Sequence, residues 1–201
     1  MQKGAVTQSR LPRRARATDR FVSFYFSSLP QQELGFYAET YLEAARTLLR
    51  SLRRRGGFSE IAAAPVLFMY RHAIELYLKS IIVVGNRSGP ADDEKLFRSL
   101  KGHKLSPLLS RVEAVFSLAG WEWKWPLNPL VETKADVQSL LAYLEAIDPE
   151  SFAFRYPVDK RGQRAIATDV RFNLESVVVA LDALATALDT ADAGLKAEFG
   201  L

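Results

Sequence analysis

The sequence predicts an all-α fold, an antiparallel bundle of about five helices with a small aromatic hairpin or loop inserted into it. Three observations lead to this prediction. Apolar residues recur at helical spacing in five segments, glycine, proline and polar residues separate these segments, and only one short region alternates as a strand would. The chain of 201 residues is 48% hydrophobic and 25% charged, which suits a single soluble globular domain. Helices with such apolar stripes bury them against one another in a bundle.

The helices can be placed from their apolar spacing and their ends. The first is expected over residues 31–55, and it closes with arginines and two glycines, which favour a helix C-terminus. The second is expected to begin near Ser59 or at Pro65 and to end at Gly85-Asn86. It is apolar on nearly every side, so it belongs at the centre of the bundle. The others are expected over residues 105–118, from Thr133 or Asp136 to Ile147, and over residues 173–197.

Two connecting regions differ from the helices. Residues 87–95 are polar and are expected to form a loop, whereas residues 96–101 fit either a helix or a loop. Within residues 148–168, Phe152, Phe154 and Tyr156 alternate ahead of turn-forming residues. This region therefore predicts either a small hairpin or an extended loop with an aromatic face.

Basic residues are concentrated at the N-terminus. The first twenty residues hold six basic residues and one acidic residue, while the whole chain has a formal charge of +4. We expect residues 1–20 to form a basic, disordered arm ahead of a helical domain over residues 21–201. The arm either binds polyanions through counterion release or is only a solubilising leader, and a mitochondrial transit peptide would have a similar composition. The candidate nucleic-acid contacts in it are Arg10, Arg13, Arg14 and Arg16.

Composition excludes several classes of site. The chain has no cysteine, which excludes disulfides and thiolate metal sites, and with only two histidines we expect no metal and no cofactor. It contains no Gly-rich phosphate loop, no HExxH motif and no nucleophile elbow. Residues 61–84 are long enough to resemble a membrane span, but their central charges oppose insertion by roughly 10 kcal/mol. We therefore expect a cytoplasmic protein without a membrane partner.

The central helix has a polar stripe in an apolar run, MYRHAIELYLKSII. Arg71, Glu75 and Lys79 lie four residues apart and share one helix face, and His72 borders that face. Glu75 can pair with both cations at this spacing, which would make the stripe structural. Alternatively, the stripe faces a polar cleft or a dimer interface and presents Arg71 and His72 there.

The three tryptophans, Trp121, Trp123 and Trp125, would lie on one side of an extended chain. An exposed aromatic ladder could stack single-stranded bases. The alternative is that the cluster closes one end of the bundle.

A second aromatic cluster, Phe154-Arg155-Tyr156, is followed by Lys160 and Arg161. Basic groups that alternate with aromatic rings suit nucleic-acid binding. The alternative is a loop packed over the central helix.

Three motifs in order, LFMYRHAIELYLKSII, GHKLSPLL and FRYPVDKRGQ, resemble the prokaryotic HEPN-like helical proteins. The resemblance covers roughly residues 33–190. It implies an antiparallel helical bundle and frequent homodimers. It also implies roles in RNA metabolism, toxin–antitoxin pairs and antiviral defence, often with a partner protein from the same operon.

Catalytic members of this group are metal-independent ribonucleases with an Arg-x(4–6)-His motif, two copies of which meet across a dimer. This sequence matches the spacing only at Arg98 and His103, with Ser99 where asparagine is usual and with Gly102 before the histidine. Such chemistry needs a general base for the ribose 2′-OH and a cation for the phosphorane. Arg98 with His103, or His72 with Arg71 from a second subunit, could supply them. A structural alternative is that His103 caps its helix or holds the preceding loop.

These observations predict a HEPN-like module that acts on RNA or on a partner protein in a defence or toxin–antitoxin setting, without a complete catalytic motif. The first alternative is an active, homodimeric, metal-independent endoribonuclease. The second is an adaptor that docks a partner protein through its aromatic loop.

Overall fold

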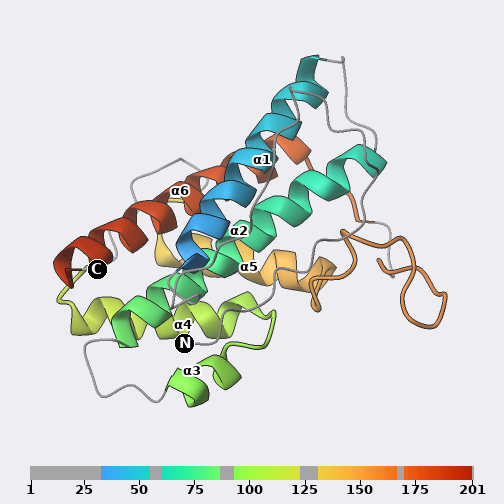
Figure 1. Ribbon diagram of the computed structural model, residues 1–201. Helices are drawn as coiled ribbons and strands as arrows, with labels where there is room; N and C mark the ends of the chain where they lie inside the picture. The colour runs from blue at the N-terminus through green and yellow to red at the C-terminus, as the bar shows by residue number, and fades with distance from the viewer. Residues whose placement is uncertain (1–32, 55–59, 87–92, 123–130, 167–169, 201) are drawn as a thin grey trace, which may run out of the picture.

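Six α-helices and no strand are formed by the residues that the computed structural model describes, which are 33–54, 60–86, 93–122, 131–166 and 170–200 (Figure 1). The helices are α1 (Leu34–Arg54), α2 (Glu60–Asn86), α3 (Asp93–Ser99), α4 (Leu105–Leu118), α5 (Lys134–Ile147) and α6 (Leu174–Glu198). The all-α helical bundle is therefore confirmed. None of the helices in these ranges is long and apolar enough to cross a membrane.

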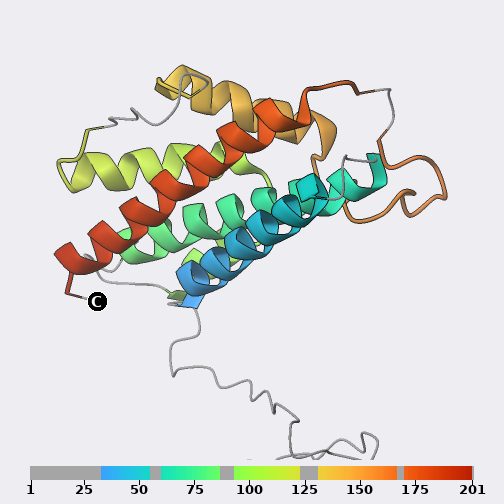
Figure 2. The same cartoon turned by 90° about the horizontal axis from the view of Figure 1, so that it is seen from above.

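Helix α2 lies at the centre of the bundle. It packs against α1, α4 and α6, and α1 runs beside it in the opposite direction (Figures 1 and 2). Its side chains are buried around the helix, including Tyr70, Ile74, Tyr77 and Leu78 at 1% exposure or less. A helix without a polar outer face is stable only when other helices cover it, so the predicted central position is confirmed.

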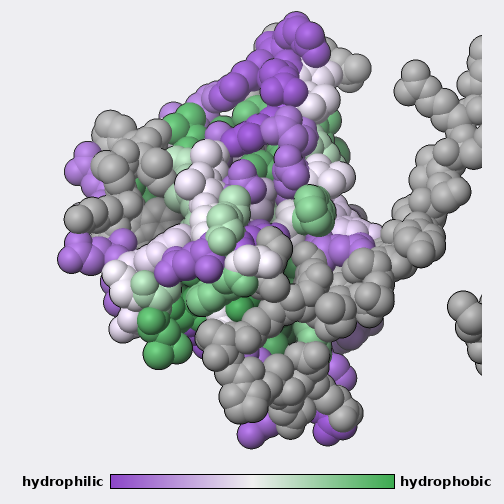
Figure 3. Space-filling model, turned by 60° about the vertical axis from the view of Figure 1, so that its left-hand side comes forward, coloured by the Kyte–Doolittle hydropathy of each residue, from purple (hydrophilic) through white to green (hydrophobic). Residues whose placement is uncertain are grey.

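Helix α1 is amphipathic and lies on the outside of the bundle. Ala38, Leu42, Ala45 and Leu49 form its buried stripe at helical spacing. Its last turn holds arginines, and the end of α1 at the top of Figure 1 is hydrophilic in Figure 3. Basic residues at this end interact favourably with the helix dipole.

The predicted helix starts are confirmed at α5 and α6. Thr133 caps α5 in a capping box, in which its side chain accepts a hydrogen bond from Asp136 N and the Asp136 carboxylate accepts one from Thr133 N. Asn173 caps α6 through a hydrogen bond from Ser176 N.

One connection differs from the expectation. Residues 93–95 were expected in a polar loop, but they form the first turn of α3. Leu96 and Leu100 explain the difference, because these two residues, one turn apart, are both buried in the bundle core and hold the segment against it.

The region after α5 contains turns and, among its described residues, a single bridge between Val158 and Arg164, and it projects from the bundle as a loop (Figure 1). The insertion is therefore a loop, but its aromatic part is a turn and not an extended chain, because Arg155 N and Tyr156 N both donate to the Phe152 carbonyl.

Candidate functional site

The polar stripe of α2 lies in the protein interior. Arg71 is fully buried and the Glu75 side chain is 1% exposed. Arg71 Nη1 lies 3.4 Å from Glu75 Oε2, and Lys79 Nζ lies 2.6 Å from Glu75 Oε1. The prediction that Glu75 pairs with both cations is therefore confirmed.

Arg71 also contacts two segments that are distant in the sequence. Its Nη2 donates to the carbonyl oxygen of His103 over 2.9 Å, and its Nε lies 3.8 Å from Asp148 Oδ2. Neither this Nε nor this Oδ2 has a hydrogen-bond partner among the described residues. Arg71, Glu75, Lys79 and Asp148 together are called the buried charge cluster below. Its central guanidinium connects α2, the entry to α4 and the end of α5.

Asp148 holds the start of the aromatic loop. It is the fully buried C-cap residue of α5, and its Oδ1 accepts hydrogen bonds from Phe152 N and, at 2.8 Å, from Ala153 N. Because Oδ1 fixes the loop and Oδ2 faces Arg71, the loop is tied to the middle of α2. The sequence analysis missed this residue, although an aspartate followed by proline at a helix end is a signal for a turn.

His103 precedes Lys104, the N-cap residue of α4, and its side chain reaches back to α2. Its Nδ1 is 3.0 Å from Glu75 Oε1, while 47% of its side chain is exposed. Burial alone would raise the pKa of Glu75, but hydrogen bonds from Lys79 and His103 outweigh it and hold the pKa below its usual value. The imidazole is thus held by a charged carboxylate and remains accessible to solvent.

The backbone around His103 is fixed from α5. Lys104, the N-cap residue of α4, makes no side-chain capping bond. The carboxylate of Glu145 caps the helix in place of the Lys104 side chain. Glu145 Oε1 accepts hydrogen bonds from Leu105 N and, at 2.9 Å, from Ser106 N. A carboxylate is favourable at a helix N-terminus, but this cap comes from another helix and was not predicted from the sequence.

His72 is half-buried in a pocket of aromatic rings. Its imidazole stacks on Phe68, with ring centroids 5.5 Å apart, and meets the edge of Tyr41 at 4.5 Å. Burial lowers the pKa of His72, Glu75 opposes this shift, and the positive charges of Lys79, Arg155 and His103 lower the pKa further. His72 therefore lies within the electrostatic influence of these basic side chains.

The aromatic loop adds an exposed ring and a cation beside His72. The guanidinium of Arg155 lies 5.3 Å from the Phe68 ring and 5.8 Å from the Tyr156 ring. Tyr156 is 50% exposed and stacks on Phe152 at 4.6 Å. We call Phe68, His72, Phe152, Arg155 and Tyr156 the aromatic face. The loop packs over the central helix, as one alternative predicted, and it keeps Arg155 and Tyr156 exposed.

Other predicted site residues lie elsewhere. Arg98 is exposed in the last turn of α3, which ends at Ser99, so Arg98 and His103 do not share a continuous helix. Lys160 and Arg161 lie exposed at the tip of the projecting loop, where Arg161 pairs with Asp159.

Of the tryptophans, the structure describes only Trp121. Its Nε1 donates to Glu198 Oε2 over 2.9 Å and its ring lies 5.6 Å from Phe116, so it connects the ends of α4 and α6. This contact is the kind that the alternative of a closed bundle end predicted. Trp123 and Trp125 lie outside the described residues, as do Arg10, Arg13, Arg14 and Arg16.

The structure therefore brings together seven of the predicted site residues. They are Arg71, His72, Glu75, Lys79, His103, Arg155 and Tyr156. Within the described ranges, no group of three or more His, Asp or Glu side chains is placed to hold a metal ion. Comparison of the chain with protein-family models, curated proteins and solved structures found no match. The resemblance to HEPN-like proteins therefore stays a prediction.

Proposed function

We propose that this protein is a HEPN-like helical module that binds single-stranded RNA across its aromatic face and His103. The observation that carries the proposal is the position of Arg155, between the exposed Tyr156 and the Phe68–His72 stack. Bases stack on aromatic side chains with a gain of about 1–3 kcal/mol each, and a guanidinium binds phosphate through paired hydrogen bonds.

The electrostatics of this surface support an anionic ligand. The charge of the exposed Arg155 acts on His72, and Glu75 and Asp148 are buried and paired with Arg71 and Lys79. A ligand on the surface therefore meets the positive charge of Arg155. Since attraction between exposed charges is screened by salt, we expect affinity to fall as salt rises.

The buried charge cluster has a positioning role in this proposal. Arg71 is fully buried, so it does not reach a ligand in this structure. It holds the carbonyl of His103 and faces Asp148, which in turn fixes the aromatic loop. The cluster thereby sets the distance between the two segments that contact RNA.

RNA cleavage is a second candidate, favoured by the contact between His103 and Glu75. A half-exposed imidazole whose Nδ1 is 3.0 Å from a carboxylate has the orientation of a general base or acid. In that reaction His103 would take the proton of a ribose 2′-OH, and nearby cations would stabilise the phosphorane. The HEPN resemblance adds the expectation that two copies of the chain act together.

Fluorescence anisotropy with labelled single-stranded RNA tests the binding proposal. We expect Tyr156→Ala to weaken binding by about 5- to 150-fold, the equivalent of one lost stack, and Arg155→Gln to reduce both affinity and its salt dependence. The controls are Tyr37→Ala and Arg54→Gln, which alter exposed residues of the same types on α1.

Cleavage is measured on the same RNA with EDTA present. Cleavage that His103→Ala abolishes would support the second candidate, and binding without cleavage would support the first. The proposal is contradicted if RNA does not bind, which would favour a protein-binding adaptor. It is also contradicted if deletion of residues 1–20 abolishes binding while Tyr156→Ala and Arg155→Gln leave it unchanged.

A further inference from the structure

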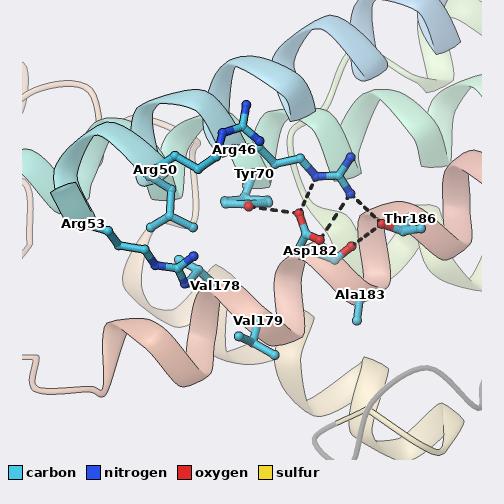
Figure 4. A pocket seen from close by; sticks show the side chains of 10 residues that line it. Arg46, Arg50, Arg53, Tyr70, Val178, Val179, Asp182, Ala183 and Thr186 are labelled. Carbon is cyan, nitrogen blue, oxygen red and sulfur yellow. Dashed lines mark hydrogen bonds and ion pairs between the residues drawn. The ribbon is translucent and has the colours of Figure 1, made fainter.

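A groove lies between α1 and α6, away from the aromatic face. Its volume is about 570 Å³, and α1 lines it with Arg46, Arg50 and Arg53 while α6 contributes Asp182 (Figure 4). Tyr70 of α2 also lines it. Because Tyr70 and Arg71 are consecutive, their side chains leave α2 about 100° apart, which separates this groove from the buried charge cluster. A cavity of this size is typical of small-molecule sites.

The polar groups at the base of the groove are held by one another. Asp182 Oδ1 accepts from Tyr70 Oη at 3.0 Å and from Arg46 Nε at 2.7 Å, and Arg46 Nη2 donates to Thr186 Oγ1 at 2.7 Å (Figure 4). Tyr70 is 1% exposed. Asp182 is therefore paired with Arg46, whereas Arg50 bonds to Thr47 and Arg53 pairs with Glu175.

Arg50 and Arg53 are available to an anion to different degrees. Among the described residues, Arg50 donates to the Thr47 hydroxyl at 2.9 Å and forms no ion pair. Arg53 pairs with Glu175, and both side chains are nearly half exposed. Such exposed pairs contribute little free energy, so a dianion could displace Glu175. Arg50 and Arg53 lie one turn apart on α1 and both line the groove, and a guanidinium presents paired donors that suit a phosphate.

The remaining walls of the groove are apolar. Leu49 comes from α1, and Val178, Val179 and Ala183 come from α6. A ligand that fits both parts has a charged end and a ring or other apolar body. We infer that the groove between α1 and α6 binds a phosphate-bearing ligand of mononucleotide size, with its phosphate on Arg50 and Arg53 and its base against Val179 and Ala183. The inference does not depend on RNA binding at the aromatic face.

Isothermal titration calorimetry of the full chain with adenosine monophosphate tests this site. We expect adenosine monophosphate to bind saturably. Adenosine, which lacks the phosphate, and inorganic phosphate, which lacks the base, should bind more weakly. The double variant Arg50→Gln/Arg53→Gln should weaken binding at least about tenfold, as loss of two charged hydrogen-bonding groups implies. Arg54→Gln is the matched control, because Arg54 is exposed on the same helix and does not line the groove.

A second variant tests the position of the ligand by shape. Ala183→Trp should fill the groove and abolish binding without a change of charge, and thermal unfolding of this variant checks that it folds. Tyr156→Ala should leave the affinity for adenosine monophosphate unchanged, which separates this site from the aromatic face. Displacement of the nucleotide by a 5′-phosphorylated RNA oligonucleotide would identify an RNA end as the source of the phosphate, and its absence would identify a free nucleotide.

Three results would overturn the inference. The first is no binding of adenosine monophosphate at millimolar concentration. The second is an equal loss of affinity in the Arg54→Gln control. The third is undiminished binding by a folded Ala183→Trp variant, which would place the nucleotide outside the groove.

Discussion

Removal of the Arg71 charge is expected to destabilise the protein strongly. Arg71→Met keeps a long unbranched side chain but leaves Glu75 and Asp148 buried without their central cation. At an effective dielectric constant of about 20, the attractions over 3.4 and 3.8 Å amount to about 5 and about 4 kcal/mol. Much of this offsets the cost of removing the guanidinium from water, so we expect a net loss of about 3–5 kcal/mol of unfolding free energy.

Urea unfolding followed by circular dichroism measures this loss. The matched control is Arg53→Met, because its ion pair with Glu175 is exposed and pairs of that kind contribute about 0–1 kcal/mol. If the loss comes from stranded carboxylates, Arg71→Met/Asp148→Asn should recover at least about 1 kcal/mol relative to Arg71→Met. The reasoning is refuted if Arg71→Met loses no more stability than Arg53→Met. It is also refuted if Asp148→Asn destabilises the Arg71→Met variant as much as it destabilises the wild type.

Two further perturbations follow from the packing. The pKa of His72 is lower in the folded chain than the value of about 6.5 in the unfolded chain. Below about pH 6.5 the unfolded chain therefore binds more protons, and the free energy of unfolding falls as the pH falls toward the folded pKa. His72→Phe should therefore lose less stability than the wild type between about pH 7.5 and pH 5, and equal losses in two urea series would contradict this. Gly85→Ala would place a Cβ atom 2.4 Å from Val115 Cγ1 and should cost about 1–3 kcal/mol in thermal unfolding. Gly102→Ala meets no atom within 4 Å, so an equal cost there would show that the clash is not the cause.

Much of the fold could be predicted because the patterns are local. The capping residues Thr133 and Asp136 indicate a helix start, and the apolar residues on nearly every side of α2 indicate burial, both without reference to the rest of the chain. The exception was residues 93–95, where the polar sequence favoured a loop. Their helix depends on Leu96 and Leu100 docking on the core, and that contact is tertiary.

The site could be predicted only in part for the same reason. The pairing of Arg71, Glu75 and Lys79 follows from spacing on one helix. By contrast, the contact of His103 with Glu75 spans 28 residues, and Asp148 faces Arg71 from the end of another helix. Single-sequence patterns contain no information on such distances, so Asp148 and Glu145 were missed.

The most direct test of RNA binding at the aromatic face is a cross-linking map. The full chain is irradiated with 4-thiouridine RNA, and the modified residues are identified by mass spectrometry. We predict adducts in the peptides that contain His103 and Tyr156, and we predict that Tyr156→Ala removes the second of these. Adducts confined to residues 1–20, or to the groove between α1 and α6, would contradict the proposal.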